Sequence, residues 1–112
     1  MIYYTEEEGG ALREAFEDRV LVWKKVETRT MFGCPAYVAE GKLFAFLVGD
    51  GVVITQIRKR DREALAEIFD TEPFTAGERE IERWQRVHLE SVERLSRVIP
   101  YVKKSYQLVL NR

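Results

Sequence analysis

The chain has 112 residues, of which 46% are hydrophobic and 33% charged, and its formal net charge is −1. This length is typical of one globular domain, which we place at residues 1–112. The sequence pI of 5.9 argues against nucleic acid as a direct ligand, and no apolar run approaches the ~20 residues of a membrane span. One cysteine, Cys34, excludes an internal disulfide bond, and we expect a cytoplasmic location.

The N-terminal segment has the pattern of an amphipathic helix. Thr5 and Glu8 have the spacing of a capping box. Gly9 and Gly10 weaken a helix by about 1 kcal/mol each, which moves the expected start toward Ala11. Apolar residues then recur at spacings of three and four and form one face, namely Leu12, Ala15, Phe16, Val20 and Trp23.

Residues 27–57 change to the period of β-strands. Short β-rich runs at residues 37–38, 43–48 and 52–57 are separated by turns that contain glycine. Asp50-Gly51 suits a type I′ turn, in which both central residues need a positive φ. The pattern predicts a three-stranded antiparallel meander.

A second helix is expected from about Asp61 to Phe69, with Asp61 as its N-cap. Pro73 ends it, because the residue before a proline avoids the helical region. Residues 74–77 are expected to form a loop or short strand, and residues 80–89 a strand.

The last predicted element is a C-terminal helix that begins at Ser91, and Pro100 either interrupts it or starts a second segment. The resulting order is helix, three strands, helix, one or two strands, helix. Strands that pair in sequence, with helices between the groups, indicate an α+β fold with an antiparallel sheet.

The strand at residues 43–48 is apolar on both faces. Regular alternation places on one side Leu43, Ala45 and Leu47, and on the other side Phe44, Phe46 and Val48. Three short helices can cover one face of such a sheet, so loops or another molecule must cover the second. We therefore expect Phe44, Phe46 and Val48 to form an interaction face, for a homodimer or for an apolar ligand or peptide. The alternative is that the helices divide between both faces and no partner is needed.

Three short motifs precede and enter the predicted meander: Met31-Phe32-Gly33, Ala36-Tyr37-Val38 and Gly41-Lys42-Leu43-Phe44-Ala45. They resemble the N-terminal domain of the TfoX/Sxy family, in which a Met-Phe-Gly-Gly element leads into such a hairpin; here Cys34 replaces the second glycine. The resemblance covers about residues 10–110. It implies a fold similar to the dimeric type III secretion chaperones, and a role in regulating natural competence together with the cyclic-AMP receptor protein.

The densest basic cluster lies between the meander and the second helix, and it consists of Arg58, Lys59, Arg60 and Arg62. It is either a solvated corner of the fold or a candidate anion contact. The single histidine, His88, and Cys34 could form a nucleophile pair, although a free cysteine is more often a small buried hydrophobe. We expect no catalytic residue, metal or cofactor.

The leading hypothesis is a non-enzymatic interaction or regulatory domain, related to transcription or competence, that acts through protein–protein association. The alternative is a small-ligand-binding domain with its pocket between sheet and helices, near Phe44, Phe46 and Trp84.

Overall fold

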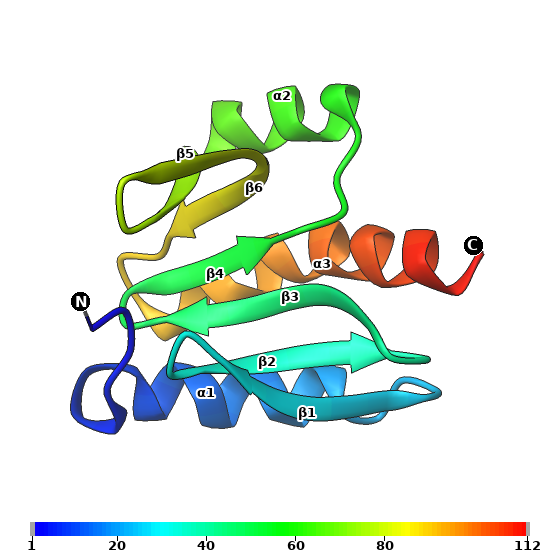
Figure 1. The fold of residues 1–112 in the computed structure, drawn as a ribbon, viewed down its shortest axis with the longest axis horizontal. Coiled ribbons are helices and arrows are strands. Elements are labelled where there is room, and N and C mark those ends of the chain that lie inside the picture. Colours follow the sequence, from blue (N-terminus) through cyan, green and yellow to red (C-terminus); the bar gives the residue numbers. More distant parts are fainter. Residues whose placement is uncertain (1, 112) are drawn as a thin grey trace.

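The computed structural model describes residues 2–111 as one antiparallel sheet with three α-helices (Figure 1). The six strands have the spatial order β1-β2-β3-β4-β6-β5. The elements, in chain order, are α1 (Glu6–Val20), β1 (Val26–Met31), β2 (Cys34–Ala39), β3 (Lys42–Val48), β4 (Gly51–Ile54), α2 (Lys59–Ile68), β5 (Asp70–Ala76), β6 (Arg79–His88), the 3-10 turn η1 (Val92–Arg94) and α3 (Leu95–Leu110). The predicted α+β fold with an antiparallel sheet is confirmed. No helix within residues 2–111 is long and apolar enough to cross a lipid bilayer.

Helix α1 begins at Glu6 rather than near Ala11. The side chain of Thr5 caps it, because the Thr5 hydroxyl oxygen accepts a hydrogen bond from the backbone N–H of Glu8 at 3.3 Å. Gly9 lies inside the helix, and a Cβ atom there would approach the Tyr4 ring to 2.4 Å. Glycine therefore allows Tyr4 to pack on the first turn, and the predicted start was wrong because this packing outweighs the low helix propensity of glycine.

The chain before α2 forms four strands, one more than the predicted meander. Strand β1 pairs with β2 in the register Thr28↔Tyr37, and the residues between its two ends are exposed. Polar, charged edge strands carry no apolar alternation and discourage further pairing. By contrast, every residue of β2 is buried.

The second half of the chain confirms the predicted elements but changes their ends. Helix α2 starts at Lys59 after Arg58, which provides no side-chain cap. Asp61 is not the N-cap; its carboxylate pairs with the Lys104 ammonium at 2.8 Å. Helix α3 runs without a break through Pro100, so the predicted interruption was wrong.

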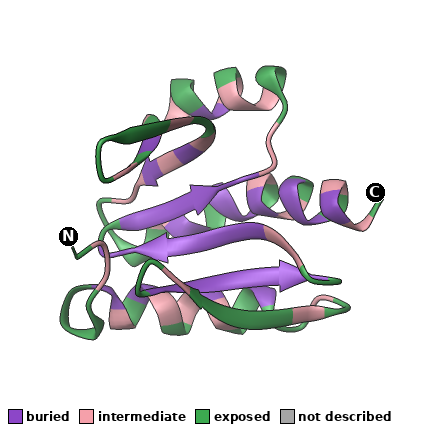
Figure 2. Ribbon diagram, in the orientation of Figure 1, coloured by how far each residue is buried: buried purple, intermediate pink, exposed green. Residues whose placement is uncertain are grey.

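The sheet is covered on both faces by its own chain. Helices α1 and α3 pack on one face, where the core includes Phe16, Leu47 and Tyr106. On the other face Phe46 packs edge-to-face on Phe74 of the β5–β6 hairpin, with ring centroids 5.0 Å apart. Figure 2 shows that the central strands β2, β3 and β4 are buried along most of their length.

A β-bulge in β3 determines which of its apolar side chains pack on each face of the sheet. Tyr37 pairs with Ala45 and Val38 with Leu43, so Phe44 has no partner residue on β2. The extra residue turns Phe44 to the same face as Ala45. There its ring packs on Tyr106, with the two ring centroids 5.5 Å apart. The expected regular alternation was therefore wrong at Phe44, and also at Leu43, which packs against the opposite cluster with Phe46.

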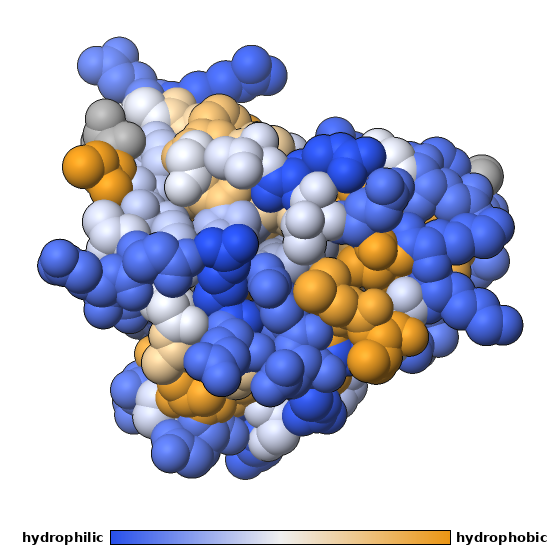
Figure 3. All heavy atoms as spheres, turned by 90° about the horizontal axis from the view of Figure 1, so that it is seen from below, coloured by the Kyte–Doolittle hydropathy of each residue, from blue (hydrophilic) through white to orange (hydrophobic). Residues whose placement is uncertain are grey.

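The expected interaction face is not available on the folded chain. Phe44, Phe46 and Val48 each have 0% exposed surface. The helices cover Phe44, whereas the β5–β6 hairpin and the N-terminal segment cover Phe46 and Val48. The expected homodimer stays a prediction, without this face to support it. On the side of the molecule that lies at the bottom of Figure 1, hydrophobic residues form separate groups among hydrophilic ones (Figure 3).

Replacing Phe46 by alanine tests this burial. A fully buried phenylalanine truncated to alanine lowers the free energy of unfolding by about 3–5 kcal/mol. Phe32, which is 47% exposed and contacts the same cluster, provides the control, and F32A should lower it by much less. Urea unfolding followed by circular dichroism measures both. A stable F46A variant that merely loses self-association would show that Phe46 faces a partner.

Candidate functional site

One opening of the structure lies where β4 and β6 separate. The two strands pair from Gly51↔His88 to Ile54↔Gln85. After Ile54 the chain turns away toward α2, whereas the earlier residues of β6 pair with β5. The separation leaves a space bounded by the β4–α2 connection, by β6 and by the last turn of α3.

Buried hydrogen bonds hold the chain at the exit of β4. Thr55 donates its backbone N–H to the Phe44 carbonyl at 3.3 Å and its hydroxyl to the Leu43 carbonyl at 3.0 Å. The Ser105 hydroxyl, from α3, donates to the same Phe44 carbonyl at 2.6 Å and accepts the Gln56 N–H at 3.1 Å. These bonds satisfy the bulged part of β3 and fix Thr55 and Gln56 as one wall of the space.

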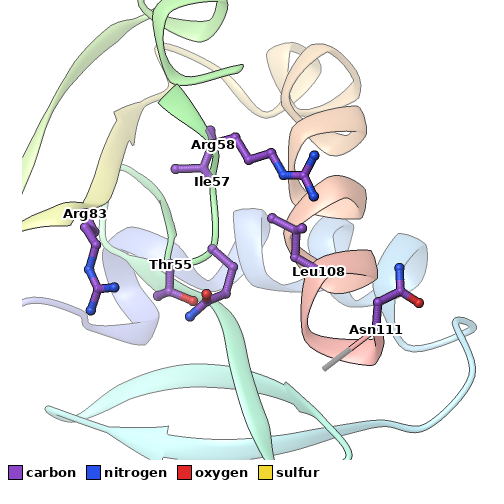
Figure 4. Close-up of a pocket in the computed structure, with 7 residues that line it drawn as sticks. Thr55, Ile57, Arg58, Arg83, Leu108 and Asn111 are labelled. Carbon is purple, nitrogen blue, oxygen red and sulfur yellow. The ribbon is translucent and has the colours of Figure 1, made fainter. Parts of the chain in front are cut away.

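The space is a pocket of about 460 Å³ lined by Thr55, Gln56, Ile57, Arg58, Arg83, Leu108 and Asn111. Figure 4 shows Arg83 entering from β6 on one side, and Leu108 and Asn111 from α3 on the other, with Thr55 between them. Two guanidinium groups, a hydroxyl and two amides therefore surround a pocket that also has two aliphatic side chains in its wall.

The pocket carries positive charge that nothing in its own wall neutralises. Arg58 and Arg83 form no ion pair within residues 2–111, and no carboxylate belongs to the lining. Helix α2 also begins at this point, and the first N–H groups of a helix lack intrahelical acceptors. Because the N-terminal end of a helix carries partial positive charge, this end adds to the potential from the arginines.

The predicted basic cluster divides in the structure. Arg58 lines the main pocket, and Arg58 and Arg60 line an adjoining pocket of about 290 Å³. Lys59 instead lies 3.8 Å from the Glu63 carboxylate, and Arg62 lines neither pocket. Arg83 was not predicted at this site. It lies in β6, far along the chain, and no sequence pattern indicates that this strand contributes a residue to the pocket.

The expected pocket near Phe44, Phe46 and Trp84 is filled by side chains. Phe44 and Phe46 are fully buried, and the Trp84 ring packs on Phe46 with centroids 5.6 Å apart. The ligand-binding alternative therefore loses its expected pocket near the aromatic core.

Cys34 and His88 do not form a nucleophile pair. The Cys34 thiol donates to the Phe32 carbonyl at 3.7 Å, and burial raises its pKa to about 11. Both ring nitrogens of His88 are occupied by carboxylates. Within residues 2–111 no group of three or more His, Cys, Asp or Glu side chains could hold a metal ion.

His88 instead joins the β3–β4 turn to the edge strand β5. Its Nδ1 lies 3.0 Å from an Asp50 oxygen and its Nε2 3.0 Å from a Glu72 oxygen, while Arg86 lies 3.1 Å from the second Asp50 oxygen. Only a protonated imidazole donates from both nitrogens. Burial lowers the pKa of His88, but the hydrogen bonds to Asp50 and Glu72 outweigh it and raise the pKa above 6.5.

The burial of Cys34 predicts an inert thiol. A pKa of about 11 instead of 9.0 lowers the thiolate fraction near pH 7 by roughly a hundredfold. Iodoacetamide should label the folded protein at least that much more slowly than the protein unfolded in guanidinium chloride. Comparable rates in the two states would show that Cys34 is an activated, accessible thiolate.

The contacts of His88 predict a contribution to stability that depends on pH. Because the folded-state pKa is raised, the contribution is fully present below about pH 6.5 and disappears as the pH rises through the folded-state pKa. The difference in unfolding free energy between the wild type and H88Q should therefore shrink from about pH 6 to about pH 9, as measured by urea unfolding at each pH. A difference that stays constant over this range would contradict the charged bridge.

Comparison with known proteins gives no match for this chain, either to a family model, to a curated protein or to a solved structure.

Proposed function

We propose that this protein is a binding domain for a small anionic molecule, which it holds in the pocket where β4 separates from β6. The observation that carries the proposal is the pair Arg58 and Arg83, which line one pocket without a carboxylate in its wall and without an ion pair within residues 2–111. Elsewhere the chain pairs several of its cations, as in Arg13 with Glu17 and Lys104 with Asp61.

The chemistry of the lining supports an anion of modest size. A guanidinium group offers a planar fork of N–H donors that matches carboxylate and phosphate oxygens. The amides of Gln56 and Asn111 add neutral N–H donors. The volume of about 460 Å³ lies within the usual range of small-molecule sites, roughly 300–1,000 Å³.

The positive charge is local, which favours a small ligand over a nucleic acid. The whole chain has a net charge of −1, whereas proteins that follow a phosphate backbone carry many basic residues along one surface. The lining also contains no carboxylate, histidine or cysteine that could act as a base or nucleophile. We therefore propose binding rather than catalysis.

The regulatory role implied by the resemblance to the TfoX/Sxy family stays a prediction. A regulatory domain that binds an anion would respond to the concentration of that anion. It would not need association through Phe44, Phe46 and Val48, which are buried.

Removing both arginines of the pocket tests the proposal. Inorganic phosphate titrated into the protein at low ionic strength should bind about fivefold more weakly to the double variant R58Q/R83Q, since two exposed charge contacts together contribute about 1 kcal/mol. Isothermal titration calorimetry measures both affinities.

The matched control is R79Q/R97Q, which removes the same charge from two exposed arginines outside the pocket. It should bind phosphate as the wild type does. Equal weakening in the two double variants would show that the response reflects net charge and would contradict a site at Arg58 and Arg83.

A further inference from the structure

Resting on the proposed anion-binding function, we infer that the ligand carries two separate anionic groups, one held at Arg83 and the other at Arg58 and Arg60. The guanidinium groups of Arg83 and Arg58 do not converge on one point. Figure 4 shows Arg83 at the β6 side of the pocket, whereas the Arg58 side chain extends toward α3.

The main pocket continues into the adjoining pocket of about 290 Å³. The two share Arg58, Leu108 and Asn111, so these residues line both spaces. The smaller pocket adds Arg60 and Lys104, together with one carboxylate, Asp61, which is already paired with Lys104 at 2.8 Å. Positive charge therefore continues past Arg58 to Arg60 at the start of α2. A single small anion bound at Arg83 would not neutralise the charge of these two arginines.

Between the two basic positions the wall is partly apolar. Ile57 and Leu108 line the main pocket, and Leu108 also lines the smaller one. Aliphatic side chains pack favourably against a hydrocarbon spacer, whereas a charged spacer would find no hydrogen-bond partner among them. The chemistry that fits is a small molecule with two carboxylates or two phosphoryl groups joined by a short carbon chain.

A length series of bis-anions tests the inference. The probes are the straight-chain dicarboxylates from malonate to adipate and the alkane bisphosphonates of the same lengths, each compared with the mono-anion of the same headgroup. One spacer length should bind at least about tenfold more tightly than its mono-anion, because the second group then binds at a high effective concentration. A gain in either series supports the inference, and the tighter series identifies the anionic group.

Single variants locate the two ends of the ligand. R60Q and R83Q should each remove most of the gain from the second anionic group, and R97Q should leave it intact. Arg60 is exposed and lines only the smaller pocket, so R60Q should fold normally.

Two results would overturn the inference: bis-anions that bind no more tightly than mono-anions at any length, or a gain that R60Q leaves unchanged. In either case the anion site would still stand if phosphate binding depends on Arg58 and Arg83. Loss of that dependence as well would contradict the proposed function itself.

Discussion

The buried hydroxyl of Ser105 and the bulged residue Phe44 are the constraint on which the site depends. The Phe44 carbonyl accepts the Thr55 N–H, which continues the β3–β4 register beyond Ala45↔Ile54, and it also accepts the Ser105 hydroxyl from α3. A buried carbonyl without a partner would destabilise the fold by about 1–3 kcal/mol, so these bonds keep the exit of β4 against α3. With the exit of β4 held there, β4 and β6 separate and the basic pocket opens between them.

The same bulge resolves the apparent excess of apolar residues in β3. It sends Phe44 to the helices, while Phe46 and Val48 stay on the opposite face. There the curled β5–β6 hairpin supplies Phe74 and Trp84, and the segment before α1 supplies Tyr3. Aromatic pairs of this kind add about 0.5–1.5 kcal/mol beyond the area that they bury. A strand with two apolar faces therefore needs no second molecule when a hairpin folds back over the sheet.

Local sequence patterns predicted the fold class and most elements, but they could not locate the site. The cap at Thr5 and the strands of the meander follow from spacing alone. Strand β1 carries no apolar alternation, and the Ser105 hydroxyl that bonds the bulged residue Phe44 lies far along the chain. The basic cluster at Arg58 was visible in the sequence. That Arg83 lines the same pocket depends on where β6 separates from β4, which local patterns do not show.

The most direct test of the account is to map where a bound anion lies. Inorganic phosphate can be titrated into ¹⁵N-labelled protein while the backbone amide and arginine Nε–H signals are followed by NMR. The account predicts saturable shifts at the Arg58 and Arg83 side chains and at the backbone amides of residues 55–60, with little change around His88 at the C-terminal end of β6. Shifts centred elsewhere, or small shifts spread over all exposed arginines, would contradict an anion site at the separation of β4 and β6.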